Sequence, residues 1–147
     1  MQSGKKPVRV VKAVHGAATS VEDPAYEAGL SEALKADYSR DGLVELYGRF
    51  AQGDGKLDTL MRRAIIRALA VRCGYGLKIG AGAWFKHPET FTIGNSLFVG
   101  AGAQIQGRFD GSFVIGDNCW IGPQAFLDAR DLVFGDYVGW GPGAKIL

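Results

Sequence analysis

The chain has 147 residues, of which 47% are hydrophobic and 22% charged, and its formal net charge is +2 at neutral pH. This length allows one domain with a hydrophobic core, and the small net charge gives no electrostatic reason to expect nucleic acid or an anionic membrane as a partner. No run of 18 apolar residues is present, so no membrane span is predicted. Arg9 and Lys12 interrupt the apolar run near the N-terminus, which argues against a secretory signal. We therefore expect a cytoplasmic location.

Residues 1–72 are expected to form a loose start followed by about three helices. The helices are predicted over residues 24–36, 40–50 and 57–72. Asp23 is the expected N-cap of the first helix and Ser39 that of the second. Apolar residues recur at helical spacing in the third helix. Its opposite side carries three arginines that are expected to face solvent, with contact to phosphates as the alternative: Arg62, Arg63 and Arg67.

Residues 73–147 differ from the first half and show a period of six. They contain 15 of the 22 glycines, whereas glycine is usually about 7% of a protein. In each unit an apolar residue comes first, glycine follows it, and a small or aliphatic residue returns four positions later. The regular units open at Cys73, Ile79, Ile93, Val99, Ile115, Ile121, Phe134 and Trp140.

Such short units cannot bury an apolar face alone, so they must stack into a solenoid. One unit makes a short strand and a corner, and three units make a triangular coil. The opening residue and the residue four positions later are predicted to fill the core. Asn95 and Asn118 are predicted to adopt left-handed backbone torsions at corners.

The coils are interrupted at one corner. Successive coils begin 20, 22 and 19 residues apart, although three uninterrupted units need only about 18. The irregular segments 86–92, 106–114 and 128–133 all follow the third unit of a coil, so they are predicted to stack along one edge. A solenoid edge built from loops is a predicted binding face.

These Ile/Val-Gly-x-x-Ala/Val-x units resemble the hexapeptide-repeat acyltransferases, and the resemblance covers all of 73–147. It implies an all-β solenoid, namely a left-handed parallel β-helix of four triangular coils, preceded here by an α-helical segment. Asp128 stands six residues before Phe134-Gly135-Asp136, and Trp140-Gly141-Pro142-Gly143 follows. This arrangement is similar to that of the maltose- and galactoside-type O-acetyltransferases.

The resemblance implies transfer of an acetyl group from acetyl-CoA to a hydroxyl or amine, usually of a sugar, without a metal. It also implies a homotrimer with sites between neighbouring β-helices. Asp128 is expected to orient the acceptor or a catalytic histidine, with a corner aspartate that accepts hydrogen bonds from turn N–H groups as the alternative. The expected acetyl-CoA contacts are Trp140, Gly141 and Ala144. The family's general base is a histidine on the corner loop after the third unit, where an imidazole suits proton transfer near neutral pH. In the last coil this histidine is expected beyond Leu147.

Only two histidines, His15 and His87, are present. His87 lies on the expected corner but three coils too early; it is a candidate base, with a surface-loop histidine as the alternative. A zinc site of the γ-carbonic-anhydrase type needs three histidines, so it is disfavoured. Trp84 and Trp120 occupy the sixth position of their units, and we expect them to point outward. They are predicted either to lie in the interface of the trimer or to pack against the N-terminal helices. The alternative function is a non-catalytic β-helix scaffold, or an inactive fragment of such an enzyme.

Overall fold

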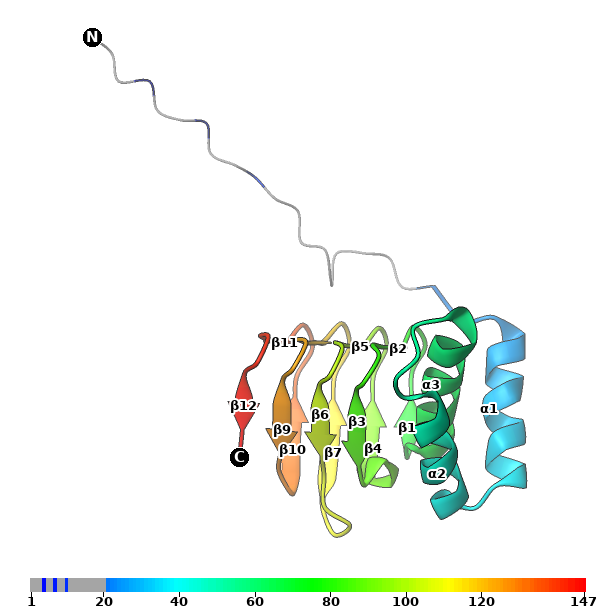
Figure 1. Cartoon of the computed structure of the whole chain (residues 1–147). Coiled ribbons are helices and arrows are strands. Elements are labelled where there is room, and N and C mark those ends of the chain that lie inside the picture. Colours follow the sequence, from blue (N-terminus) through cyan, green and yellow to red (C-terminus); the bar gives the residue numbers. More distant parts are fainter. Residues whose placement is uncertain (1–3, 5–6, 8–9, 11–20) are drawn as a thin grey trace.

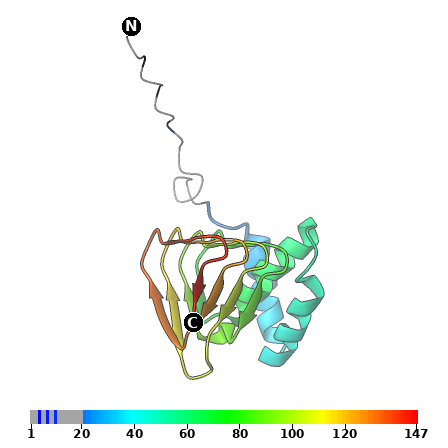
Figure 2. The same cartoon turned by 60° about the vertical axis from the view of Figure 1, so that its left-hand side comes forward.

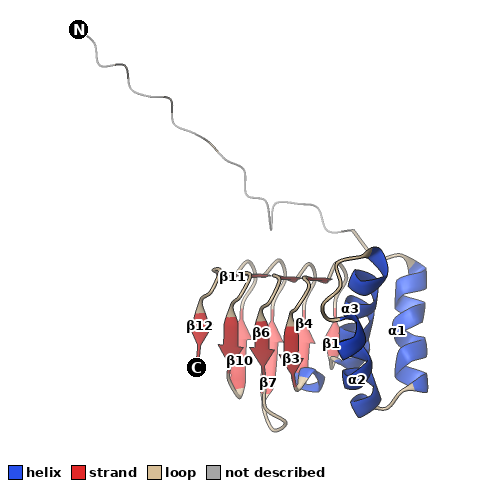
Figure 3. Ribbon diagram, in the orientation of Figure 1, coloured by secondary structure: helices blue, strands red, loops and turns tan. Residues whose placement is uncertain are grey.

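The computed structural model describes residues 4, 7, 10 and 21–147, so His15 lies outside the described residues. Three helices come first: α1 (Ala25–Asp37), α2 (Arg40–Phe50) and α3 (Lys56–Leu69). A series of short strands follows, with one 3-10 turn, η1 (Pro88–Thr90), among them (Figure 1, Figure 3). The strands are β1 (Arg72–Cys73), β2 (Lys78–Ile79), β3 (Trp84–Lys86), β4 (Phe91–Ile93), β5 (Phe98–Val99), β6 (Gln104–Gln106), β7 (Ser112–Ile115), β8 (Trp120–Ile121), β9 (Phe126–Asp128), β10 (Asp131–Phe134), β11 (Gly139–Trp140) and β12 (Lys145–Ile146).

The strands form three parallel sheets of four strands each, and every coil contributes one strand to each sheet. We call them sheet A (β1-β4-β7-β10), sheet B (β2-β5-β8-β11) and sheet C (β3-β6-β9-β12). This is the predicted parallel β-solenoid of four triangular coils. Figure 2 shows the helices at one end of the solenoid and β12 at the other.

The solenoid core contains the residues that the repeat predicts. The opening residues Ile79, Val99 and Ile121 are buried, and so are the small residues four positions later, Ala83 and Ala103. In the last coil Val138 and Ala144 are only half-buried, whereas the opening residue Phe134 is buried. The core prediction is therefore confirmed in the inner coils.

The corners need left-handed backbone at the fourth position of a unit. Asn118 has a φ of 57°, as predicted, but the prediction for Asn95 is wrong because its neighbour Ser96 takes that conformation, with a φ of 57°. Asn95 instead begins a side-chain ladder along the corner. Its Oδ1 accepts a hydrogen bond from the Tyr75 N–H at 3.0 Å, and Oδ1 of Asp117 accepts one from the Asn95 N–H at 2.7 Å. Each coil thus satisfies backbone donors of the coil before it.

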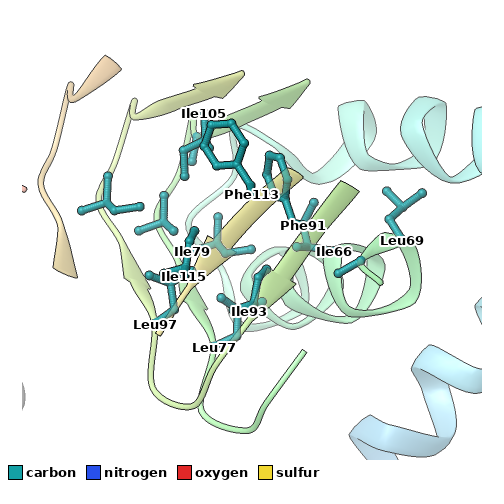
Figure 4. Packing of buried hydrophobic residues seen from close by; sticks show 14 of the residues in the cluster. Ile66, Leu69, Leu77, Ile79, Phe91, Ile93, Leu97, Ile105, Phe113 and Ile115 are labelled. Carbon is teal, nitrogen blue, oxygen red and sulfur yellow. The ribbon is translucent and has the colours of Figure 1, made fainter. Parts of the chain in front are cut away.

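The helices pack on the first coil, and α3 contacts β2 and η1. Figure 4 shows Ile66 and Leu69 of α3 in one cluster with Phe91 of the solenoid. The third helix ends at Leu69, three residues before the predicted end, because residues 72–73 form β1. One apolar core therefore joins the helices to the β-helix.

The prediction of a solvated arginine face on α3 is wrong. Arg62 is fully buried, and it donates hydrogen bonds to backbone carbonyls of Phe50 at 2.8 Å and of Ile79 at 3.2 Å. Arg63 pairs with the buried Glu27 of α1. Charged groups are buried only when they have polar partners. The partners of these two arginines lie on other elements, so the arginines connect the helices to each other and to the solenoid.

The capping prediction holds for one helix of two. Ser39 caps α2, and its Oγ accepts a hydrogen bond from the Gly42 N–H at 3.1 Å. Asp23 does not cap α1, whose N-cap is Pro24. The Asp23 carboxylate instead accepts a hydrogen bond from the Gly76 N–H at 3.1 Å and pairs with Arg67. The start of α1 is thus fastened to the first corner of the β-helix.

Within the described residues, no helix has the length and apolar character that a membrane crossing requires.

Candidate functional site

The loops that join sheet C to sheet A stack along one edge of the solenoid. They are residues 87–90, 107–111 and 129–130, which we call the corner loops. They are shorter than the segments predicted from the sequence, because β4, β7 and β10 take up part of those segments. All of them leave from the same corner, as predicted, and the loop between β6 and β7 reaches furthest (Figure 1).

His87 opens the first corner loop with left-handed backbone, at a φ of 55°. Its carbonyl accepts hydrogen bonds from the Thr90 N–H at 3.1 Å and from the Thr90 hydroxyl at 2.8 Å. This local closure of η1 fixes the backbone from which the imidazole projects. The side chain is 23% exposed, so it remains accessible from solvent.

The imidazole of His87 contacts a carboxylate and a guanidinium. Nδ1 lies 2.8 Å from Oε1 of Glu89, which also lies 3.0 Å from Nη2 of Arg40 on α2. The same Nη2 is 3.3 Å from Nδ1. Arginine only donates hydrogen bonds and an ionised carboxylate only accepts them. We therefore assign the proton to Nδ1, which donates to Glu89 over the shorter distance; Arg40 then donates to Glu89 and not to the ring, and Nε2 is left as the unprotonated nitrogen.

Partial burial works against ionisation of Glu89. The hydrogen bonds from His87 and Arg40, together with the positive charge of Arg40, outweigh that effect and hold the pKa of the Glu89 carboxyl below its usual value. Glu89 is therefore an anion near neutral pH. The histidine has the partner that a positioned general base requires.

Phe109, at the tip of the second corner loop, was not predicted as a site residue. Its ring centroid lies 6.3 Å from that of His87, with the planes tilted by 59°. The sequence feature that could have indicated Phe109 is the loop Gly-Arg-Phe-Asp-Gly, which stands at the same predicted corner as His87. Only the stacking of the coils places these two rings together.

Asp128 is the last residue of β9, at the edge of the third corner loop. Its carboxylate forms an ion pair with Arg108 of the second corner loop. Strand β6 lies between β3 and β9, and neighbouring strands are about 4.8 Å apart. The corners of His87 and Asp128 are therefore about 10 Å apart, and the Arg108–Phe109 loop lies between them.

The residues expected to contact acetyl-CoA lie in the terminal coil. The indole N–H of Trp140 donates a hydrogen bond to the carbonyl of Ala144 at 3.0 Å, and its ring packs against Phe134 at 5.9 Å. A side chain at Gly141 would meet no other atom within 4 Å. The indole N–H of Trp140 is already donated, so only its ring is left to contact a ligand.

Two outward tryptophans lie in different surroundings. Trp84 is 42% exposed and packs edge-on against Tyr47 of α2, with centroids 5.8 Å apart. Trp120 lies beside Phe98 on the outer face of sheet B, with ring planes only 13° apart. The helices thus cover part of the first tryptophan.

The chain matches no protein-family model, and no curated protein matches it significantly.

Proposed function

We propose that this chain is an acyltransferase that moves an acetyl group from acetyl-CoA to a hydroxyl or amine of a sugar-sized acceptor. The observation that carries the proposal is the hydrogen bond between Nδ1 of His87 and Oε1 of Glu89, 2.8 Å long, on the loop-bearing edge of a parallel β-helix. The resemblance of the repeat units to acyltransferases of this fold supports it.

The chemistry assigns one role to each group. His87 takes a proton from the acceptor on Nε2 as the acceptor oxygen or nitrogen attacks a thioester carbonyl, and it returns that proton to the departing thiolate. Glu89 holds the ring and balances the positive charge that the imidazole gains. Acetyl-CoA supplies the thioester, and the family resemblance implies contacts with it at Trp140, Gly141 and Ala144.

The test is release of CoA from acetyl-CoA, followed with a thiol reagent, in the presence and absence of a panel of sugars. His87→Gln should lower kcat by roughly 100- to 10,000-fold, the usual contribution of a general base, while circular dichroism and the melting temperature stay close to those of the parent. Undiminished turnover in His87→Gln would show that His87 is not the base. The family pattern places the base at a histidine beyond Leu147. Acceptor-independent CoA release would refute the proposal.

A second candidate, a non-catalytic scaffold, is favoured by the adjacent rings of Phe98 and Trp120 on the outer face of sheet B. Thermal denaturation with acetyl-CoA distinguishes the two functions. At 100 times its Kd, a ligand stabilises the folded state by about 2.7 kcal/mol. An acyltransferase should show this shift, and a scaffold should not.

A further inference from the structure

A groove lies between α3 and the outer face of sheet B. Its volume is about 290 Å³, close to the lower limit of small-molecule sites, roughly 300 Å³. The corner loops join sheet C to sheet A, so the groove lies on the one sheet that does not border them. It is therefore separate from the candidate base. The groove is lined by Thr59, Arg63, Lys78, Ile79, Gly80 and Phe98.

The two walls of the groove differ in chemistry. Thr59 and Arg63 are one turn apart on α3, so their side chains project from one face of that helix. Lys78 and Phe98 are paired across β2 and β5. They project outward, because the next residue in each strand, such as Ile79, is buried. The groove therefore combines charged groups with the phenyl ring of Phe98.

The charges of the groove leave one cation unbalanced. Nε and Nη2 of Arg63 donate to the Glu27 carboxylate. The Asp23 carboxylate also acts on the charge of Arg63, but it pairs with Arg67. Within the part of the chain that the structure describes, the ammonium of Lys78 has no partner and Nη1 of Arg63 donates no hydrogen bond. The groove thus offers unused N–H donors and a single excess positive charge.

We propose that this groove binds a small carboxylic acid that carries one negative charge and an apolar body. The carboxylate accepts hydrogen bonds from Nζ of Lys78 and Nη1 of Arg63, and charge-assisted bonds of this kind are stronger than neutral ones. The apolar body lies along the ring of Phe98, where both lose contact with water. A dianion such as phosphate would exceed the charge of the groove and would have no apolar body for the ring. The site goes beyond acyl transfer, because it needs neither His87 nor acetyl-CoA.

Titration of the full chain without acetyl-CoA, followed by the NMR shifts of backbone amides, tests the site. The probes are benzoate, benzyl alcohol and inorganic phosphate. Benzyl alcohol keeps the apolar body without the charge, and phosphate has the charge without the body. Benzoate should shift the amides of Ile79 and Gly80 with a Kd in the millimolar range, as is usual for so small a ligand. The other two probes should bind at least about 10-fold more weakly.

Substitution of Lys78 tests the charge. Lys78→Gln should weaken benzoate binding by roughly 10-fold, the loss of one charge-assisted hydrogen bond, whereas Lys78→Arg should preserve it. The melting temperature should not change, because Lys78 is exposed. Lys86→Gln is the matched control and should bind benzoate as the unsubstituted protein does. Lys86 is also an exposed lysine on a strand of the first coil, but its strand belongs to sheet C.

Several results would overturn the site. Equal affinity for benzoate and phosphate, or equal weakening by Lys78→Gln and Lys86→Gln, would reduce it to general attraction of anions. Amide shifts that avoid Ile79 and Gly80 would show that the groove does not bind the acid. A sedimentation coefficient altered by Lys78→Gln would assign the groove to an interface between copies. None of these results depends on CoA release, so the site and the acyltransferase can fail separately.

Discussion

Glu89 accepts a hydrogen bond from Nδ1 of His87 over 2.8 Å, and the same oxygen pairs with Arg40. The three side chains come from the first corner loop and from the start of α2, which are far apart in the sequence. This contact gives the N-terminal helices a direct part in holding the candidate base.

Replacing Glu89 tests whether the carboxylate serves the histidine. Glu89→Gln keeps the size of the side chain but removes its charge, so the imidazolium formed during proton transfer loses its counter-charge. We expect kcat to fall by roughly 10-fold or more, but by less than in His87→Gln. Arg40→Gln is the control, because it removes the ion pair and leaves the Glu89–His87 hydrogen bond. An unchanged kcat in Glu89→Gln would show that the pair has only a structural role.

The ionisation of Glu89 makes stability depend on pH. Its pKa is lowered in the folded state, against an unfolded value of about 4.3. Its contribution to the free energy of unfolding is therefore fully present above about pH 4.3 and is lost as pH falls through the folded pKa. In urea denaturation between pH 3 and 7, the free energy of unfolding should fall more steeply toward low pH for the unsubstituted protein than for Glu89→Gln. Parallel profiles for the two proteins would contradict the assignment.

Asp128 can serve the acceptor or merely hold Arg108. The pair is partly exposed, with side chains 39% and 24% accessible, so solvent screens it and breaking it should change the stability little. Asp128→Asn and Arg108→Gln both break it. If Asp128 orients the acceptor, Asp128→Asn should lower kcat by roughly 10- to 1000-fold, and Arg108→Gln should have the smaller effect. Equal kinetic effects of the two variants would show that Asp128 acts only through its ion pair with Arg108.

Arg62 should be a major source of stability. It is fully buried and donates to the carbonyls of Phe50, Gly53 and Ile79, which join the end of α2 to the solenoid. Arg62→Met leaves these carbonyls without their donor, and we expect a loss of about 3 kcal/mol or more in urea denaturation. Arg63→Met is the matched control; its pair with Glu27 is more accessible, and the loss should be smaller. A loss in Arg62→Met no larger than in Arg63→Met would contradict this account.

The homotrimer that the family resemblance implies should depend on sheet B. Phe98 and Trp120 lie side by side on its outer face, whereas Trp84 packs against Tyr47 of α2. Sedimentation should give a trimer for the parent, a shift toward monomer for Trp120→Ala, and an intact trimer of lower melting temperature for Trp84→Ala. A monomeric parent at micromolar concentration would disprove the trimer.

The six-residue period was sufficient to predict the solenoid. A repeat of fixed length assigns each residue to a side of the coil, so the burial of Ile79, Val99 and Ile121 follows from the sequence alone. The edge bearing the corner loops follows in the same way, because every insertion comes after the third unit. The helices were also recognisable, since Ser39 and the apolar spacing of α3 are local signals.

Only the tertiary structure decided which side chains meet. The local sequence predicts that Asp23 caps a helix. Asp23 instead accepts a hydrogen bond from the Gly76 N–H, because the packing of α1 against the first coil brings that donor within reach. Arg62 reads as part of a solvated face, yet the end of α2 and the first coil surround it with carbonyls. The contacts of His87 with Arg40 and Phe109 likewise arise from how α2 and the second coil stack on the first. Local periodicity carries no information about such long-range neighbours, because they depend on how whole elements pack.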